Sequence, residues 1–91
     1  MTGLAGKSVH LWLDGSRRGS RLIVREIPEG RSRTQLIRLG IVEGEEIRVV
    51  ERMPGGTVVI EKNRREIAIG AALARTIRVD IPGKLRAVAH A

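Results

Sequence analysis

The alternation of apolar and polar residues predicts short β-strands along most of the chain. In a half-buried strand successive side chains point to opposite faces, so apolar residues recur at every second position. Residues 45–53 and 77–81 follow this rule, with Ile47 and Val49 expected to face inward in the first of them. Runs rich in Ile and Val, which favour strands, predict three further strands at residues 21–27, 57–62 and 65–69.

One short helix is predicted between the strands at residues 21–27 and 45–53. Ser32 and Gln35 have the spacing of a capping box, in which each side chain satisfies a free backbone donor, so we expect the helix to begin at Ser32. Gly40 stands where a helix commonly ends in a left-handed residue, which glycine adopts without a Cβ penalty. In such a Schellman motif, Ile41 would pack back on Leu36.

These elements, with a helical turn expected at residues 71–74 before the last strand, predict a mainly β fold. The chain has 91 residues and no Cys, Phe or Tyr, so it can hold one aliphatic core without disulfides. Because closure hides edge strands, we expect a small, strongly bent β-barrel of about five strands and not an open sheet. We assign the barrel to residues 21–81, an N-terminal extension to 1–20 and a tail to 82–91. In the extension, residues 9–13 form either a strand or a helical turn.

The chain carries a net charge of +7, from 17 Lys and Arg residues against 10 Asp and Glu residues. Such a charge attracts nucleic acid and other anionic surfaces. Many arginines have an acidic neighbour, as in Arg25-Glu26 and Arg78-x-Asp80, which is typical of solvated strand faces. Binding of single-stranded nucleic acid also needs aromatic stacking platforms, and Trp12 is the only aromatic residue. The charge leaves a small basic barrel that binds nucleic acid as the alternative function, and the lack of further aromatic residues weakens it.

The sequence contains no catalytic or metal-binding motif. There is no Ser-His-Asp set and no phosphate-binding loop, and the absence of Cys excludes thiol catalysis. His10 and His90 lie at opposite ends of the chain, and neither has a second ligand at helical spacing. Glu43, Glu45 and Glu46 cluster beside a strand, where glutamates are usually solvated. We expect no enzymatic activity, no cofactor and no metal site.

Three sequence elements occur in a fixed order: Leu-x-x-Leu-Gly-Ile-x-x-Gly at residues 36–44, Met-Pro-Gly-Gly at 53–56, and Ile-Ala-Ile-Gly-x-x-Leu-Ala-x-x-Ile-x-Val at 67–79. Together they resemble the FeoA family of ferrous-iron transport accessory proteins. The resemblance implies an SH3-like barrel that acts in bacterial or archaeal Fe(II) uptake and binds the cytosolic part of the FeoB permease. Similar domains form the C-terminal part of metal-dependent repressors. The present sequence has no helix-turn-helix segment, so a free-standing protein is expected.

The resemblance also implies a partner-binding surface beside the predicted helix, formed by Leu36, Ile37, Leu39, Gly40, Ile41 and Val42. Two interpretations are open. Leu36, Leu39 and Ile41 either close the core or border an apolar cleft in which a partner helix or peptide docks. Ile37 and Val42 belong either to the core or to the exposed rim. An arginine such as Arg33 or Arg38 is a solvated helix residue in the simpler interpretation, and otherwise offers charge to a phosphate of the permease's GTPase domain.

The chain has no candidate membrane span. No apolar run approaches the roughly 20 residues that a spanning helix needs. The first six residues also lack the charged start and long apolar stretch of a secretory signal. We therefore expect a cytoplasmic protein that is brought to the inner face of the membrane by its partner.

Overall fold

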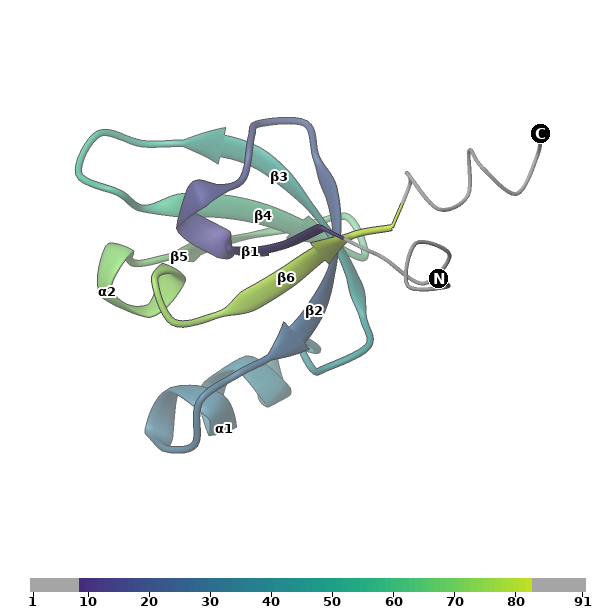
Figure 1. Ribbon diagram of the computed structural model, residues 1–91. Coiled ribbons are helices and arrows are strands. Elements are labelled where there is room, and N and C mark those ends of the chain that lie inside the picture. Colours follow the sequence, from purple (N-terminus) through teal and green to yellow (C-terminus); the bar gives the residue numbers. More distant parts are fainter. Residues whose placement is uncertain (1–8, 83–91) are drawn as a thin grey trace, which may run out of the picture.

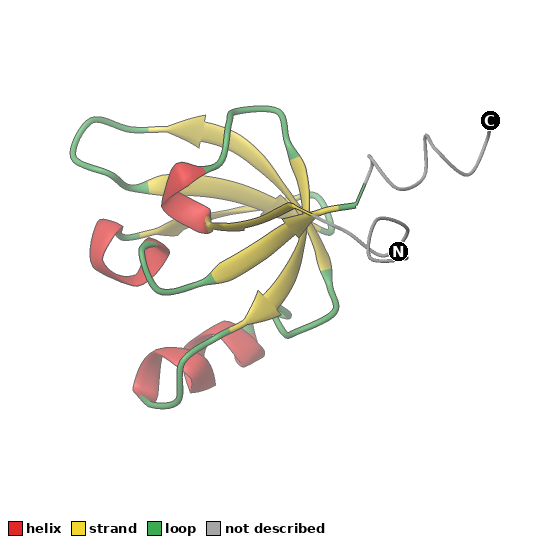
Figure 2. Ribbon diagram, in the orientation of Figure 1, coloured by secondary structure: helices red, strands yellow, loops and turns green. Residues whose placement is uncertain are grey.

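The computed structural model describes residues 9–82, which form one six-stranded antiparallel sheet with short helices at its ends and side (Figures 1 and 2). The strand order is β1-β6-β2-β3-β4-β5. Along the chain the elements are β1 (Val9–Trp12), the 3₁₀ turn η2 (Leu13–Gly15), β2 (Arg21–Glu26), α1 (Arg31–Arg38), β3 (Glu46–Arg52), β4 (Val58–Lys62), β5 (Arg65–Ile69), α2 (Ala71–Ala74) and β6 (Arg78–Ile81).

The predicted mainly β class is confirmed, and the five predicted strands lie within one residue of their expected bounds. Two details differ. A sixth strand, β1, forms in the segment for which either a strand or a helical turn was expected, and the chain then continues into η2. β1 pairs with β6 and not with β5, so β1 and β5 are the edges of the sheet and strand pairing does not close a barrel. Register shifts in the β2–β6 and β3–β4 pairs mark bulges, which bend strands and increase twist.

The core lies inside this bent sheet and is wholly aliphatic. In β3 the predicted alternation holds, because Ile47 and Val49 are buried while Glu46 and Arg48 are exposed. The same alternation fills the core from the other long strands. The remaining buried apolar residues are Leu13, Leu22, Val24, Ile27, Leu36, Ile41, Val58, Ile60, Ile69, Ala74, Ile77 and Val79.

Asp80 departs from the predicted pattern. Its neighbour Arg78 suggested a solvated strand face, yet Asp80 is only 3% exposed. β6 lies between β1 and β2, and Arg25 of β2 places its Nε 2.7 Å from the Asp80 carboxylate. A buried carboxylate needs such a partner, because burying an unpaired charge is costly.

Helix α1 begins one residue earlier than predicted, at Arg31. Its N-cap is Gly30, whose carbonyl accepts hydrogen bonds from the N–H groups of Arg33 and Thr34. No side chain caps this end, so the capping box predicted at Ser32 does not form. Gly30 has φ 130°, a backbone conformation that favours glycine.

The C-terminal end of α1 is as predicted. Gly40 has φ 87°, its N–H donates to the Ile37 carbonyl at 2.9 Å, and the Ile41 N–H donates to the Leu36 carbonyl at 2.9 Å. These two hydrogen bonds define a Schellman motif. Leu36 and Ile41 are both buried in the same core, so the helix end is anchored to the sheet.

Candidate functional site

The residues predicted to bind a partner divide into a buried and an exposed group. Leu36 and Ile41 are 2% and 1% exposed and belong to the core, so a partner cannot reach them without unfolding the helix end. Ile37 and Leu39 are 47% and 40% exposed. The core interpretation is therefore correct for Leu36 and Ile41. Ile37 and Leu39 lie on the surface instead.

The backbone explains this division. Ile37 follows Leu36 by one residue, a rotation of about 100° on a helix, so it points away from the core that Leu36 enters. Leu39 is the C-cap, and Gly40 then turns the chain back toward the sheet. Val42 is half-buried beside that turn. We refer to the surface formed by Ile37, Leu39, Gly40 and Val42 as the α1 tip.

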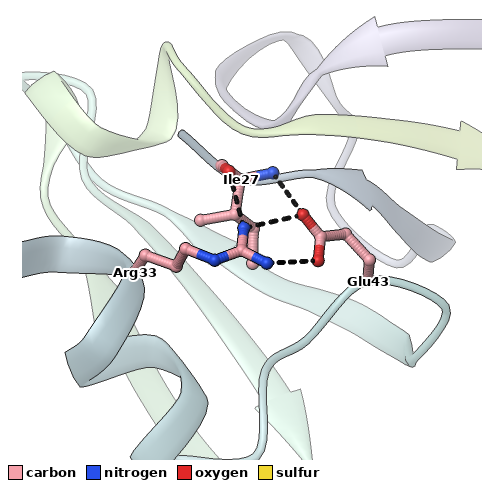
Figure 3. Close-up of polar contacts among 3 residues, drawn as sticks. All are labelled: Ile27, Arg33 and Glu43. Atoms are coloured by element: carbon pink, nitrogen blue, oxygen red, sulfur yellow. Dashed lines mark hydrogen bonds and ion pairs between the residues drawn. The ribbon is translucent and has the colours of Figure 1, made fainter. Parts of the chain in front are cut away.

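An ion pair that the sequence did not reveal holds α1 against the sheet (Figure 3). Arg33 Nη1 donates to Glu43 Oε2 at 2.8 Å, and Nη2 donates to Oε1 at 2.9 Å. Arg33 Nη1 also donates to the Ile27 carbonyl at 2.8 Å, while the Ile27 N–H donates to Glu43 Oε2 at 3.2 Å. Both side chains are thereby tied to the backbone that follows β2.

This geometry also sets the charge state of the pair. The hydrogen bond from Arg33, followed by that from the Ile27 N–H, lowers the pKa of Glu43 to about 2. The hydrogen bond to Glu43 raises the pKa of Arg33 in return. Glu43 is exposed, as expected, but its carboxylate also accepts three hydrogen bonds.

The two other glutamates of the predicted acidic cluster also have cationic partners. Glu45 pairs with Lys62, and Glu46 lies 3.9 Å from Arg21. Within residues 9–82, no three or more His, Cys, Asp or Glu side chains gather as a metal ion would require. His90 lies outside the described residues. None of the helices in the described range is long and apolar enough to span a membrane.

Two open depressions lie elsewhere on the surface. One, of about 370 Å³, separates the start of α1 from α2 and is lined by Pro28, Glu29, Arg31, Ser32, Ala72, Leu73 and Thr76. This depression borders α1, yet none of the six predicted partner-binding residues lines it. The other, of about 410 Å³, is lined by Arg21, Glu46, Ile47, Arg48, Glu61, Lys62, Asn63 and Arg64. No sequence motif marks the residues of either depression.

The sequence matches a known family over most of its length. The model of the FeoA domain matches residues 13–81, from η2 to the end of β6. The chain belongs to the FeoA family. The predicted family is therefore confirmed, and with it the SH3-like fold class. A search of the curated proteins gave no match.

Solved FeoA proteins share this fold. A crystal structure of the iron uptake regulatory protein FeoA is 30% identical, with a TM-score of 0.71, covering 79% of this chain and 97% of that one. The solution structure of a FeoA protein from Chlorobium tepidum is 26% identical, with a TM-score of 0.71 and coverage of 78% and 70%. Iron(II) transport protein A from Clostridium thermocellum is 27% identical, with a TM-score of 0.73 and coverage of 80% and 46%.

A FeoA-like fold also occurs inside larger regulators. A manganese-dependent transcriptional repressor has a TM-score of 0.72 over 82% of this chain and 43% of its own, at 19% identity. At that identity the likeness concerns the fold alone. The FeoA assignment of this chain rests on the family match and on the solved FeoA structures.

Proposed function

We propose that this FeoA-family protein is an accessory protein of bacterial or archaeal Fe(II) uptake, which binds the cytosolic part of a FeoB-type permease and modulates transport. It performs no chemistry of its own. Family membership supports the link to ferrous iron, and one solved relative is itself named an iron(II) transport protein. The permease recruits the protein to the inner face of the membrane.

The observation that carries the proposal is the exposure of Ile37 and Leu39 on a fixed helix end. Two large exposed aliphatic side chains at one helix end offer apolar area that a protein partner can cover. The Schellman motif and the Arg33–Glu43 pair hold the α1 tip in one position. A surface that is already ordered loses little conformational entropy on binding, so even a small apolar contact can contribute affinity.

The charge pattern gives less support to nucleic acid as the partner. Among residues 9–82, six Lys or Arg side chains pair with carboxylates, which reduces the charge available to phosphates. The exposed ring of Trp12 has the guanidinium of Arg78 at 6.0 Å from its centroid. A base that stacked on this ring would have to share it with that arginine.

Calorimetric titration of the full-length protein against the cytosolic domain of the permease tests the proposal. We expect the wild type to bind and a protein carrying Ile37→Asp and Leu39→Asp to bind at least about tenfold more weakly, because each change places a charge in an apolar contact. Met53→Asp is the matched control, since Met53 is also 47% exposed but lies in the β3–β4 turn. Failure of the folded wild type to bind would refute the proposed function.

A further inference from the structure

The outward face of α1 carries two arginines, Arg31 and Arg38, that form no ion pair within residues 9–82. Arg31 and Arg38 are both exposed and lie seven residues apart, which places them on the same side of the helix and about 10 Å apart along its axis. The residues between them on that side, Thr34 and Gln35, are exposed and uncharged. Residues 31–38 contain no acidic side chain.

Six other cations, from the sheet and from α1, form ion pairs within the protein. Arg33 is bound by Glu43, and cross-strand or loop contacts pair Arg21 with Glu46, Arg25 with Asp80, Arg48 with Glu61, Lys62 with Glu45, and Arg78 with Glu26. All Asp and Glu residues of the chain lie within the described range, and none of them forms an ion pair with Arg31 or Arg38 there. The two cations are thus available to carboxylates from outside.

Ile37 and Leu39, both exposed, stand on either side of Arg38 in the chain at the C-terminal end of α1, one helix length from Arg31. We propose that Arg31, Arg38 and the α1 tip form one docking surface for an acidic amphipathic helix of the partner. The apolar side chains of that helix cover Ile37 and Leu39, and its carboxylates pair with the two guanidinium groups. This inference rests on the proposed function, because the permease supplies the helix.

The spacing of the cations favours a helix as the partner segment. Two carboxylates seven residues apart on a helix are separated by the same 10 Å or so as Arg31 and Arg38, so a helix lying alongside α1 can meet both at once. Guanidinium groups bind carboxylates with two parallel hydrogen bonds, which fix orientation as well as adding energy. Charge complementarity of this kind also speeds association.

An anionic lipid surface matches the same face less well. Membrane affinity of an interfacial helix scales with the apolar area that it buries. The eight-residue helix α1 and its C-cap expose only two large apolar side chains, Ile37 and Leu39. Binding to vesicles is nevertheless one outcome of the test.

The experiment measures the dissociation constant of the full-length protein for the cytosolic domain of the permease, at about 50 mM and about 300 mM NaCl. We expect the combined change of Arg31→Glu and Arg38→Glu to weaken binding at least about tenfold and to remove most of its salt dependence. Arg18→Glu is the control. It makes the same charge change per residue in the loop between η2 and β2, at the opposite end of the molecule from α1 (Figure 1).

The outcomes separate this inference from the proposed function. Absence of wild-type binding refutes the proposed function itself. Wild-type binding that the double charge reversal leaves unchanged, or that Arg18→Glu weakens as strongly, refutes the inference alone. Sedimentation with vesicles of phosphatidylglycerol and phosphatidylcholine completes the test: vesicle binding that the double reversal abolishes, with permease binding intact, would assign the face to lipid.

Discussion

Arg33 and Glu43 meet in a two-pronged ion pair, with Nη1–Oε2 and Nη2–Oε1 distances of 2.8 and 2.9 Å. They also bind the carbonyl and the N–H of Ile27, so the pair links α1, the end of β2 and the loop that leads to β3. The Schellman motif fixes the C-terminal end of α1 in the same way. The helix is therefore held at both its first turn and its last, which keeps Ile37 and Leu39 outward.

The pair predicts an acid-dependent loss of stability. The pKa of Glu43 falls from its ordinary 4.5 to about 2 in the folded protein, mainly because it accepts hydrogen bonds from Arg33. A carboxylate whose pKa is lower in the folded state stabilises the fold above its unfolded pKa and loses this effect as the pH falls through its folded pKa. Glu43→Gln should therefore lower the melting temperature by a constant amount above about pH 5.

Between about pH 5 and pH 2 the melting temperatures of the wild type and Glu43→Gln should converge. Thermal unfolding followed by circular dichroism at several pH values measures this difference. Glu51→Gln is a suitable control, because Glu51 is exposed and no ion pair within residues 9–82 involves it. A difference between wild type and Glu43→Gln that stays constant down to pH 2 would show that the pair does not lower the pKa of Glu43.

The parts of the fold that depend on local sequence could be predicted. Alternating Ile and Val residues placed the strands because burial on one face is a local pattern. Asn63 has φ 54° in the β4–β5 turn, a left-handed conformation that asparagine adopts more readily than most residues. The N-terminal segment was harder to place. Arg52 donates to the backbone carbonyls of Asp14 and Ser16, a contact between residues more than 35 positions apart that no local pattern indicates.

The candidate site was only partly predictable for the same reason. The predicted Schellman motif correctly linked Leu36 with Ile41, which share a backbone hydrogen bond and lie in the same core. Leu39 follows Leu36 by three residues, a spacing that places two side chains on the same face of a helix. Its exposure depends on how the end of α1 meets the sheet, which this spacing does not show. The Arg33–Glu43 pair joins two elements across a loop, so neither residue is marked by its sequence neighbours.

Leu36→Ala and Leu39→Ala should separate folding from binding. Leu36 is 2% exposed in the core, and its truncation should cost about 2–5 kcal/mol because it leaves a cavity. Leu39 is 40% exposed, so its truncation should change stability by about 0.5 kcal/mol or less. Urea denaturation gives both values. In the permease titration, Leu39→Ala should weaken binding without loss of fold, and equal destabilisation by the two changes would contradict this assignment.

Gly40→Ala tests the turn that presents the α1 tip. Gly40 has φ 87°, and a Cβ at this position would meet no atom within 4 Å, so the cost is conformational and should be about 1 kcal/mol. Gly15→Ala is the matched control, because its added Cβ also meets nothing and its φ is not in the left-handed range. Urea midpoints at an unchanged m value measure both. A Gly40→Ala protein as stable as Gly15→Ala would contradict the assigned role of the left-handed turn.

The β3–β4 turn offers a similar comparison for the contact between that turn and α2. Gly55 and Gly56 have φ 91° and 100°, but only at Gly56 would a Cβ lie 2.9 Å from the Cβ of Ala71. Gly55→Ala should therefore cost about 1 kcal/mol, and Gly56→Ala should cost about 1–3 kcal/mol more, because α2 must shift to accept the methyl group. Adding Ala71→Gly should recover most of that extra cost, which a double-mutant cycle in urea measures. Equal effects of the two alanines, or no recovery, would show that this turn does not pack on α2 as closely as the structure indicates.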